Sequence, residues 1–414
     1  MMKHVTLLVI SFMICSTYGQ TKNQTTRILN ETKSTKNFEL RNRIEKNNKE
    51  KQLRIDAYLA ISIDKNQDYE INGKNYLIVD IIDGKPIAIT TDNVDAAKAT
   101  RTDAAFYSGG ELNVDIEGSG MTIGVWDSAS VLKTHVEFFG FIGTETDGKV
   151  RVTTPDFLDG KKYGNHATHV AGTIAARGAK KEARGMAPKS KIVSYDWTND
   201  KIEVLNEVED NALLISNQSY GQAVIKHGGQ VAAHLIGSYD EEAKLWDEIH
   251  FNNPFYLQVL AAGNDGTSPT TNPSTPGYDK LTKDRNSKNN LVVANAKDPT
   301  LSGFELTGLE IDPSSSQGPS DDNRIKPDIT GMGTNVLSSY ATANNHYHET
   351  SGTSMAAPNI AGSLLLLQQY YSELNSGDFM KSATLKGLAC HTADDDFTKI
   401  GPDPVFGWGL LNCL

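Results

Sequence analysis

Cysteine is scarce in this 414-residue chain, which contains only three. Cys15 falls in an apolar N-terminal run, so Cys390 and Cys413 alone remain if that run is removed. In an oxidising compartment the two could pair, or both could be inert thiols, and the sequence leaves both options open. With 38% hydrophobic residues, the chain can nevertheless bury a large core as one big domain and a smaller one.

Long apolar runs are also missing. The N-terminal run is too short to span a bilayer, and no other stretch is a transmembrane candidate. It follows Lys3 and reaches the small residue Gly19 just before a polar segment, which is the pattern of a secretory signal. We therefore expect residues 1–19 to be a signal peptide, and the mature protein to be secreted, extracellular and without membrane contact.

A net positive charge is found only near the N-terminus of the chain. The net charge is −11, yet residues 20–56 hold ten Lys and Arg against five Asp and Glu, or +5. With Lys3 adding +1, residues 57–414 carry −17. An acidic body excludes nucleic acid as an expected partner. The two parts could each present a solvated charged surface, or the basic segment could dock on the acidic body.

The N-terminal hundred residues differ from the rest of the chain. Residues 21–51 are polar and charged, and should be flexible or form a lone charged helix. A small β-rich module follows, because Asn-Gly and Asp-Gly turn signals separate short apolar runs. Its expected strands cover 58–63, 76–82 and 86–91, and 93–108 resembles a linker.

Beyond the linker, apolar strands alternate with helical patterns, which predicts an α/β fold with a mostly parallel sheet covered by helices on both faces. Strands are expected at 121–126, 191–195, 213–217, 256–262 and 291–294. Helices are expected at 166–177, 239–251, 353–371 and 379–392. In such sheets the functional residues gather at the carboxyl ends of the strands.

Ser354 is a candidate nucleophile because it opens an apolar helix. Its hydroxyl should lie near unpaired backbone N–H groups and the positive end of the helix dipole, where an oxyanion is stabilised. Gly352 permits a sharp approach, and Pro358 suits the start of a helix. A helix cap is the ordinary explanation of such a serine, so further residues must support the assignment.

Three other polar residues supply that support. Asp127 directly follows an apolar strand, His166 opens a helix of small residues, and Asn264 follows another buried strand. His169 lies one turn beyond His166, but a zinc hydrolase would require a neighbouring Glu and a third ligand, and neither is evident. We therefore expect no metal in the chemistry.

The order Asp127, His166, Asn264, Ser354 is that of an acid, a base, an oxyanion donor and a nucleophile. Gly352-Thr-Ser-Met-Ala-Ala-Pro358 and Asn165-His-Ala-Thr-His169 match catalytic signatures of the subtilisin-like (subtilase, peptidase S8) serine proteases. The resemblance extends over about residues 110–412, and the chain is similar to secreted members from Bacteroidetes-type bacteria. It implies a subtilisin-like three-layer fold and serine endopeptidase activity.

The resemblance also implies a role for each residue. Ser354 would attack the peptide bond, His166 would act as its base, and Asp127 would hold the imidazole tautomer. Asn264 and the backbone N–H of Ser354 would form the oxyanion hole, and His169 would only pack.

Substrate contacts are implied as well. Extended polypeptide would pair with an edge strand, and the pocket for the side chain before the scissile bond would lie beside it. The implied substrate-binding residues are Ser219, Tyr220, Gly221, Ala262, Gly263 and, as the pocket floor, Gly277. A glycine floor would tolerate large apolar side chains with little charge selectivity, unless Gly277 is merely a turn glycine. Two departures, Ala167 after the catalytic His and Met332 before the nucleophile, bear more on specificity than on chemistry.

In this family a segment between signal and protease acts as chaperone and inhibitor. We accordingly assign residues 20–105 to a pro-segment with its linker and 106–414 to the catalytic domain, with a self-inflicted cut between about 90 and 108. We expect a monomer whose partners are polypeptide substrates and its own pro-segment. No cofactor is expected for the chemistry, although structural calcium could bind in Asp- and Asn-rich loops. The alternatives are a catalytically silent binding protein and a serine esterase.

Overall fold

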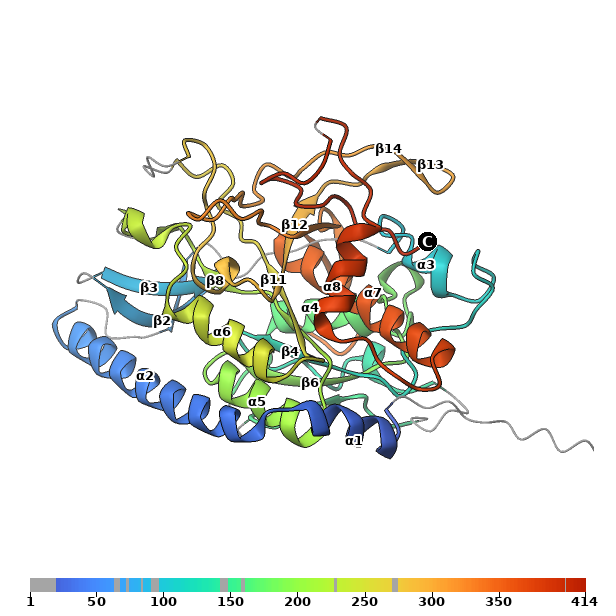
Figure 1. The fold of residues 1–414 in the computed structure, drawn as a ribbon, viewed down its shortest axis with the longest axis horizontal. Helices are drawn as coiled ribbons and strands as arrows, with labels where there is room; N and C mark the ends of the chain where they lie inside the picture. Colours follow the sequence, from blue (N-terminus) through green and yellow to red (C-terminus); the bar gives the residue numbers. More distant parts are fainter. Residues whose placement is uncertain are drawn as a thin grey trace, which may run out of the picture.

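A seven-stranded sheet forms the centre of the protein in a computed structural model (Figure 1). The structure describes residues 20–62, 68–71, 74–82, 85–90, 97–141, 148–157, 161–226, 229–269, 275–398 and 400–414. The strand order is β15-β12-β11-β7-β4-β6-β5, and every pair is parallel. The strands are β4 Thr122–Asp127, β5 Val152–Thr153, β6 Lys191–Asp196, β7 Ile215–Gln218, β11 Leu257–Ala261, β12 Leu291–Ala296 and β15 Ile329–Met332.

All five predicted strands are present in this sheet. Their apolar runs are buried on both sides, as parallel strands between two helical layers require. The two outermost strands, β5 and β15, were not predicted because each is very short and carries few apolar residues.

Helices cover both faces of the sheet. The predicted helices are confirmed as α4 Asn165–Ala175, α6 Glu241–Asn252, α7 Thr353–Leu374 and α8 Ser382–His391, and α5 Asp200–Asn211 is an additional one. One buried cluster joins α4, α7 and α8 to the sheet, and a separate cluster joins α5 and α6 to it. The protein therefore has the three layers of a subtilisin-like α/β fold.

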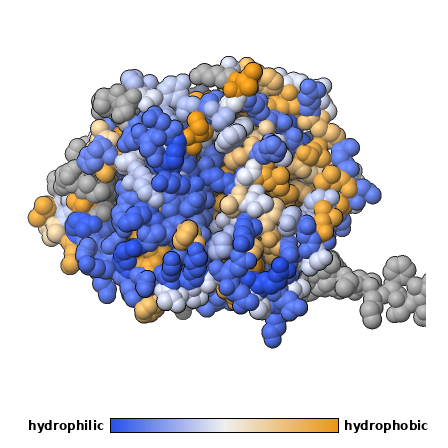
Figure 2. Space-filling view, in the orientation of Figure 1, coloured by the Kyte–Doolittle hydropathy of each residue, from blue (hydrophilic) through white to orange (hydrophobic). Residues whose placement is uncertain are grey.

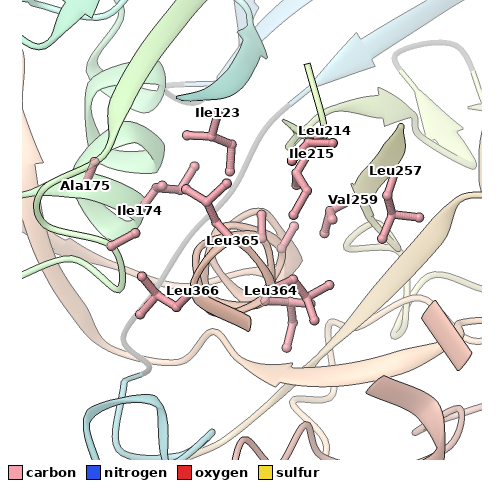
Figure 3. Close-up of a cluster of buried hydrophobic side chains, with 14 of the residues drawn as sticks. Ile123, Ile174, Ala175, Leu214, Ile215, Leu257, Val259, Leu364, Leu365 and Leu366 are labelled. Carbon is pink, nitrogen blue, oxygen red and sulfur yellow. The ribbon is translucent and has the colours of Figure 1, made fainter. Parts of the chain in front are cut away.

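The helix α7 lies in the middle of the larger cluster (Figure 3). Its residues Leu364, Leu365 and Leu366 are fully buried. They point in different directions around the helix axis, toward side chains such as Ile174 and Ile215. A helix that is apolar all round must be buried on every side. This burial fixes the start of α7 at one position above the sheet.

The basic N-terminal segment folds as α1 Lys22–Glu31 and α2 Ser34–Ile61, and α2 lies along α5 and α6 (Figure 1). Leu40 and Ile44 of α2 join the apolar cluster beneath it. Ion pairs flank this apolar contact: Arg41 to Glu209 at 2.6 Å, Lys51 to Glu242 at 2.9 Å, and Arg43 to Glu248. The docking of a basic segment on an acidic body is therefore confirmed, whereas the helix is not a lone one.

The surface over α2, α5 and α6 is mostly hydrophilic in Figure 2, as the charges along this seam require. The strand predicted at 58–63 is wrong, because residues 58–61 continue α2. Its apolar residues follow the helix rather than a strand since the helix already packs on the body from Leu40 onward.

A small antiparallel sheet follows α2. It contains β1 Asp68–Ile71, β2 Lys74–Ile82 and β3 Lys85–Thr90, which confirms the other two predicted strands. The predicted Asn-Gly and Asp-Gly turns lie outside the described residues. The fourth strand of this sheet, β8 Gly221–Gln222, comes from the main body, so β3 pairs directly with it.

The expected linker 93–108 is wrong in its second half. Residues 91–96 lie outside the described residues, but 97–106 include the helix α3 Thr102–Phe106 and are largely buried. The Thr102 hydroxyl lies 2.6 Å from that of Ser363, and Thr100 O accepts from Cys413 N at 3.1 Å. This stretch is therefore part of the catalytic body.

The remaining strands are short: β9 Ile225–Lys226, β10 Gly229–Gln230, β13 Thr300–Ser302, β14 Glu305–Gly308, β16 Val336–Tyr340 and β17 His346–Thr350. None of the helices in the described ranges combines the length and the apolar character needed to cross a membrane. Cys390 and Cys413 are free thiols, and burial raises their pKa values to about 11 and about 12. The structure thus favours the inert alternative for both.

Candidate active site

Four predicted residues meet at the carboxyl edge of the sheet. Asp127 ends β4, and Asn264 follows β11 by three residues. His166 and Ser354 are each the second residue of a helix, α4 and α7. Because β4 and β11 both neighbour β7, their ends lie close together, and the two helix starts face that edge.

Asp127 and His166 form a hydrogen-bonded pair. The His166 Nδ1 lies 2.6 Å from Asp127 Oδ2, while Asp127 Oδ1 accepts from the Ser128 N–H at 2.7 Å and from its hydroxyl at 3.0 Å. Asp127 is fully buried, so these bonds fix its orientation. A carboxylate at Nδ1 places the ring proton there, which leaves Nε2 as a proton acceptor. The Nε2 atom has no hydrogen-bond partner among the described residues.

Ser354 is 2% exposed, and its hydroxyl donates to Ser219 O at 3.0 Å. In return Ser219 Oγ donates to Ser354 O at 2.7 Å and accepts from Asn217 Nδ2 at 2.9 Å. This reciprocal pair ties the start of α7 to the segment after β7. His166 Nε2 makes no hydrogen bond to Ser354 here, and catalytic hydrogen bonds of this kind often form only once substrate is bound.

Asn264 is oriented by Thr353. Its Oδ1 accepts from the Thr353 backbone N–H at 3.0 Å and from the Thr353 hydroxyl at 3.1 Å. Because these two donors hold the carbonyl oxygen, they fix the orientation of the Asn264 side-chain amide at the start of α7. The Ser354 backbone N–H is among the first four of α7, which have no partner within the helix. Asn264 Nδ2 and Ser354 N can thus act together on one oxyanion.

His169, the other histidine of the motif, is fully buried. Its Nε2 lies 3.0 Å from His348 O and 3.3 Å from Val336 O. Burial is the main cause that lowers the pKa of His169 to about 3. It is therefore a packing residue, as the sequence indicates. Within the described ranges, no three or more His, Cys, Asp or Glu side chains gather as metal ligands would.

The segment Ser219-Tyr220-Gly221 runs along the site. Gly221 pairs with Thr90 and Gln222 with Ile89, so an extended segment of the same chain already adds to this edge as an antiparallel strand. The Tyr220 hydroxyl donates to Asp200 Oδ2 at 2.9 Å, which ties that side chain to the start of α5. A cavity of about 720 Å³ separates the edge from α2.

Ala262 and Gly263 form the opposite wall. Ala262 is fully buried, and Gly263 N donates to Thr353 Oγ1 at 3.1 Å. Gly277 is not held in this group by any described contact. It has φ +85° and follows Pro276 in a turn closed by Tyr278 N donating to Thr275 O, and a Cβ at Gly277 would meet nothing within 4 Å. The turn and the positive φ account for a glycine here, and the open space beside it equally suits a pocket floor, so the role of Gly277 stays a prediction.

Sequence reasoning missed two residues of this region. Thr353 orients Asn264 and Gly263 through its hydroxyl, and its place before Ser354 was the available signal. Arg285 donates to both walls, from Nε to Ala261 O at 2.9 Å and from Nη1 to Gln222 O at 2.8 Å. Nothing in the polar stretch around Arg285 distinguishes it in the sequence.

Comparison with known proteins agrees with this arrangement. Residues 118–409 match the model of the subtilase family, Peptidase_S8. Serine protease AprX of Bacillus subtilis (strain 168) is 26% identical over 326 residues, which cover 72% of this chain and 66% of AprX. Subtilisin BL of Lederbergia lenta is 25% identical over 302 residues, covering 72% of this chain and 91% of that protein.

Among solved structures, the CspB protease of Clostridium perfringens is similar with a TM-score of 0.57 and 15% identity, covering 77% of this chain and 98% of that one. The self-cleaved protease domain of PatA has a TM-score of 0.50 and 19% identity, covering 72% of this chain and 95% of that one. At these identities the structures support the fold alone. Because the family model matches more than half of its residues, the chain belongs to the subtilase family of serine proteases, peptidase family S8.

Proposed function

We propose that the chain is a secreted serine endopeptidase that cleaves peptide bonds through Asp127, His166 and Ser354 and is made as a self-processed precursor. The observation that carries the proposal is the convergence of the Asp127–His166 pair with the Thr353-oriented amide of Asn264 at the start of α7. Each of the four positions that the reaction needs, for acid, base, oxyanion donor and nucleophile, holds a suitable residue, and this opposes a catalytically silent role.

The reaction would proceed in two steps. His166 Nε2 takes the Ser354 proton while Oγ attacks the carbonyl carbon, and Asp127 stabilises the imidazolium that forms. Asn264 Nδ2 and Ser354 N donate to the oxyanion. His166 then protonates the leaving amine, and water hydrolyses the acyl-enzyme by the same route. Since the base must be neutral, activity is lost in acid.

The pro-segment assignment has separate support. Residues 20–90 lie on the body through α2 and through β3, which occupies the edge strand that extended substrate would use. A largely apolar run at residues 5–15 supports export of the precursor. The PatA neighbour is described as self-cleaved, which is a property of that protein and is proposed here for this one.

A fluorophosphonate probe tests the nucleophile. We expect the native protein to be labelled on Ser354, and Ser354→Ala to remain unlabelled with unchanged thermal unfolding. The same substitution should lower kcat on a peptide by roughly 10⁶, the loss known for subtilisin nucleophiles. Ser351→Ala, three residues upstream and outside the helix, is the control that should retain both labelling and turnover. Label on another residue, or turnover near that of the wild type, would refute the assignment.

Casein and a short-chain ester separate the endopeptidase from an esterase. Only a polypeptide can pair with the edge at Gly221, so casein hydrolysis that depends on Ser354 is expected. Hydrolysis of the ester without any cleavage of casein would favour the esterase instead.

A further inference from the structure

Arg285 is a buried cation that the proposed mechanism does not use. It is 3% exposed and lies in the short 3-10 helix Lys283–Asn286. Its Nε and Nη1 donate to backbone carbonyls, and Nη1 also lies 3.5 Å from Thr282 Oγ1. Among the described residues, no acceptor takes a hydrogen bond from Nη2.

No carboxylate among the described residues forms an ion pair with Arg285, although buried charges are almost always paired. The two acids that influence it are Asp284 and Asp265. Burial raises the pKa of Asp284 to about 7 and also raises that of Asp265, so both are shifted toward their neutral forms. Asp265 is further occupied by the Val224 N–H at 2.9 Å. The guanidinium therefore lacks a strong anionic partner.

The guanidinium lies between the two walls of the site. A Cβ at Gly221 would collide with Nη2, and a Cβ at Gly263 would come within 3.0 Å of Cζ and Nη1. Gly263 also has φ +105°, which favours glycine. Each wall thus carries a glycine where it faces Arg285, so the guanidinium closes the space between the edge strand and the segment after β11.

The pairing of β3 indicates which substrate side chain would reach this space. Thr90 lies opposite Gly221 in an antiparallel register. A peptide that keeps this register places the residue two positions further on opposite Ser219, whose carbonyl oxygen is 3.0 Å from the Ser354 hydroxyl. Paired residues of antiparallel strands share a face, and so do residues 219 and 221. The side chain next to the nucleophile therefore lies on the face where Arg285 lies.

We propose that Arg285 selects an acidic side chain, Asp or Glu, at the position preceding the scissile bond. The proposal rests on the proposed endopeptidase function and names its substrate class. A carboxylate in this position would accept a charge-assisted hydrogen bond from Nη2 and supply the missing counter-ion. The expectation of an apolar pocket with little charge selectivity, based on a glycine floor at Gly277, is replaced by this one.

The chain's own sequence fits the proposal. In the register of β3 the residue opposite Ser219 would be Asp92, which makes Asp92-Asn93 the expected point of self-cleavage. Residues 91–96 lie outside the described residues, so this step uses only the register of Thr90 and the printed sequence. The N-terminus that self-cleavage leaves is therefore a second readout of the preference for an acidic residue.

A set of peptides that differ only in the residue before the cleaved bond tests the selectivity on the wild-type enzyme. We expect kcat/KM for Asp or Glu to exceed that for Phe, Leu and Lys by at least about 10-fold, the range of one charge-assisted hydrogen bond. Ser354-dependent cleavage with Phe or Leu preferred would overturn the role of Arg285 while leaving the endopeptidase intact. Failure to cleave any peptide would instead refute the proposed function.

Arg285→Gln should reduce the Glu-to-Phe ratio by about 10- to 100-fold, whereas Arg285→Lys should retain part of it. Arg324→Gln is the matched control, because Arg324 donates to Asn286 O at the end of the same 3-10 helix without facing the walls. An unchanged ratio in a folded Arg285→Gln enzyme would contradict the proposal. Should that variant fail to fold, the wild-type ratio and the new N-terminus decide: Asn93 supports the proposal, and a cut after a neutral residue opposes it.

Discussion

In the proposed mechanism Asn264 donates to the oxyanion, and Thr353 holds Asn264 in position. The Thr353 hydroxyl and N–H hold Asn264 Oδ1, so Nδ2 is preset for a charge that exists only during the reaction. We expect Asn264→Ala to lower kcat by about 10²–10³ with little change in KM, the range typical for one oxyanion donor. Thr353→Val keeps the N–H and the shape, so its loss should be smaller, roughly 10-fold. Steady-state kinetics on one peptide measures both, and a change confined to KM would show that Asn264 binds the ground state instead.

His169 gives a prediction about stability in acid. Burial lowers its pKa to about 3, whereas a histidine in an unfolded chain has a pKa of about 6.5. Between these values the unfolded chain binds the proton more readily, so the free energy of unfolding falls as the pH drops from about 6.5 toward 3. The slope from one such group is at most about 1.4 kcal/mol per pH unit. His169→Gln should remove this contribution and make the fall shallower.

Urea unfolding between pH 4 and 7, carried out on Ser354→Ala to prevent digestion, measures the slope. His250, whose pKa burial lowers to about 4, provides a second acid-sensitive group that remains in the variant. In the active background His169→Gln should keep its peptidase activity. An unchanged slope, or loss of activity in a folded protein, would contradict the packing role.

The position of each proposed catalytic residue in the fold could be predicted from sequence, because each one follows or opens an apolar pattern. Asp127 and Asn264 come after buried strands, and His166 and Ser354 open helices of small or apolar residues. Arg285 could not be found in this way. Its position depends on two carbonyl oxygens at residues 222 and 261, which only the folded sheet brings together.

At the scale of elements, the sequence predicts the sheet strands directly, whereas it offers the N-terminal helix only as one of two alternatives. The strands are continuous apolar runs, which a parallel sheet requires. The helix α2 is polar along most of its length and contributes only Leu40, Ile44 and Ile55 as buried apolar residues. Its stability depends on α5 and α6 beneath it, and such tertiary contacts leave little trace in local sequence.

The ion pairs beneath α2 give a prediction for that element. Arg41 and Glu209 are mostly buried, with side-chain exposures of 17% and 21%. In the Ser354→Ala precursor, Arg41→Glu should lower the free energy of unfolding by roughly 1 kcal/mol, because it places two carboxylates together. Adding Glu209→Arg should restore most of the lost free energy of unfolding.

Urea titrations at low and high salt measure this effect. The difference in the free energy of unfolding between Arg41→Glu and its parent should shrink at 1 M salt. Lys46→Glu is the control, since Lys46 is 76% exposed and, among the described residues, forms an ion pair only with Glu50 of its own helix. An Arg41→Glu precursor as stable as the Lys46→Glu one would show that the ion pairs do not hold α2 in place.

At the scale of the whole molecule, the N-terminal part and the protease body share one sheet. Because β3 adds to β8, residues 20–90 cannot leave without exposing the edge at Gly221. Residues 97–106, in contrast, are buried in the body, with Thr102 bonded to Ser363 on α7. A chain that is anchored on both sides of residues 91–96 can lose its N-terminal part only by a cut between the two anchors.

We therefore expect the wild-type protein to cut itself within residues 91–96, while Ser354→Ala accumulates with residues 20–96 still attached. The body should keep residues 97–106 in both proteins, because their removal would take the Thr102 hydroxyl from Ser363 and the Thr100 carbonyl oxygen from Cys413 N. Active enzyme added in trans could trim the mutant, so both proteins must come from a protease-free host. Intact-mass measurement decides the matter. The same mature N-terminus in both proteins would refute self-processing, a full-length and active wild type would refute the pro-segment, and a cut beyond residue 97 would contradict the anchoring of α3.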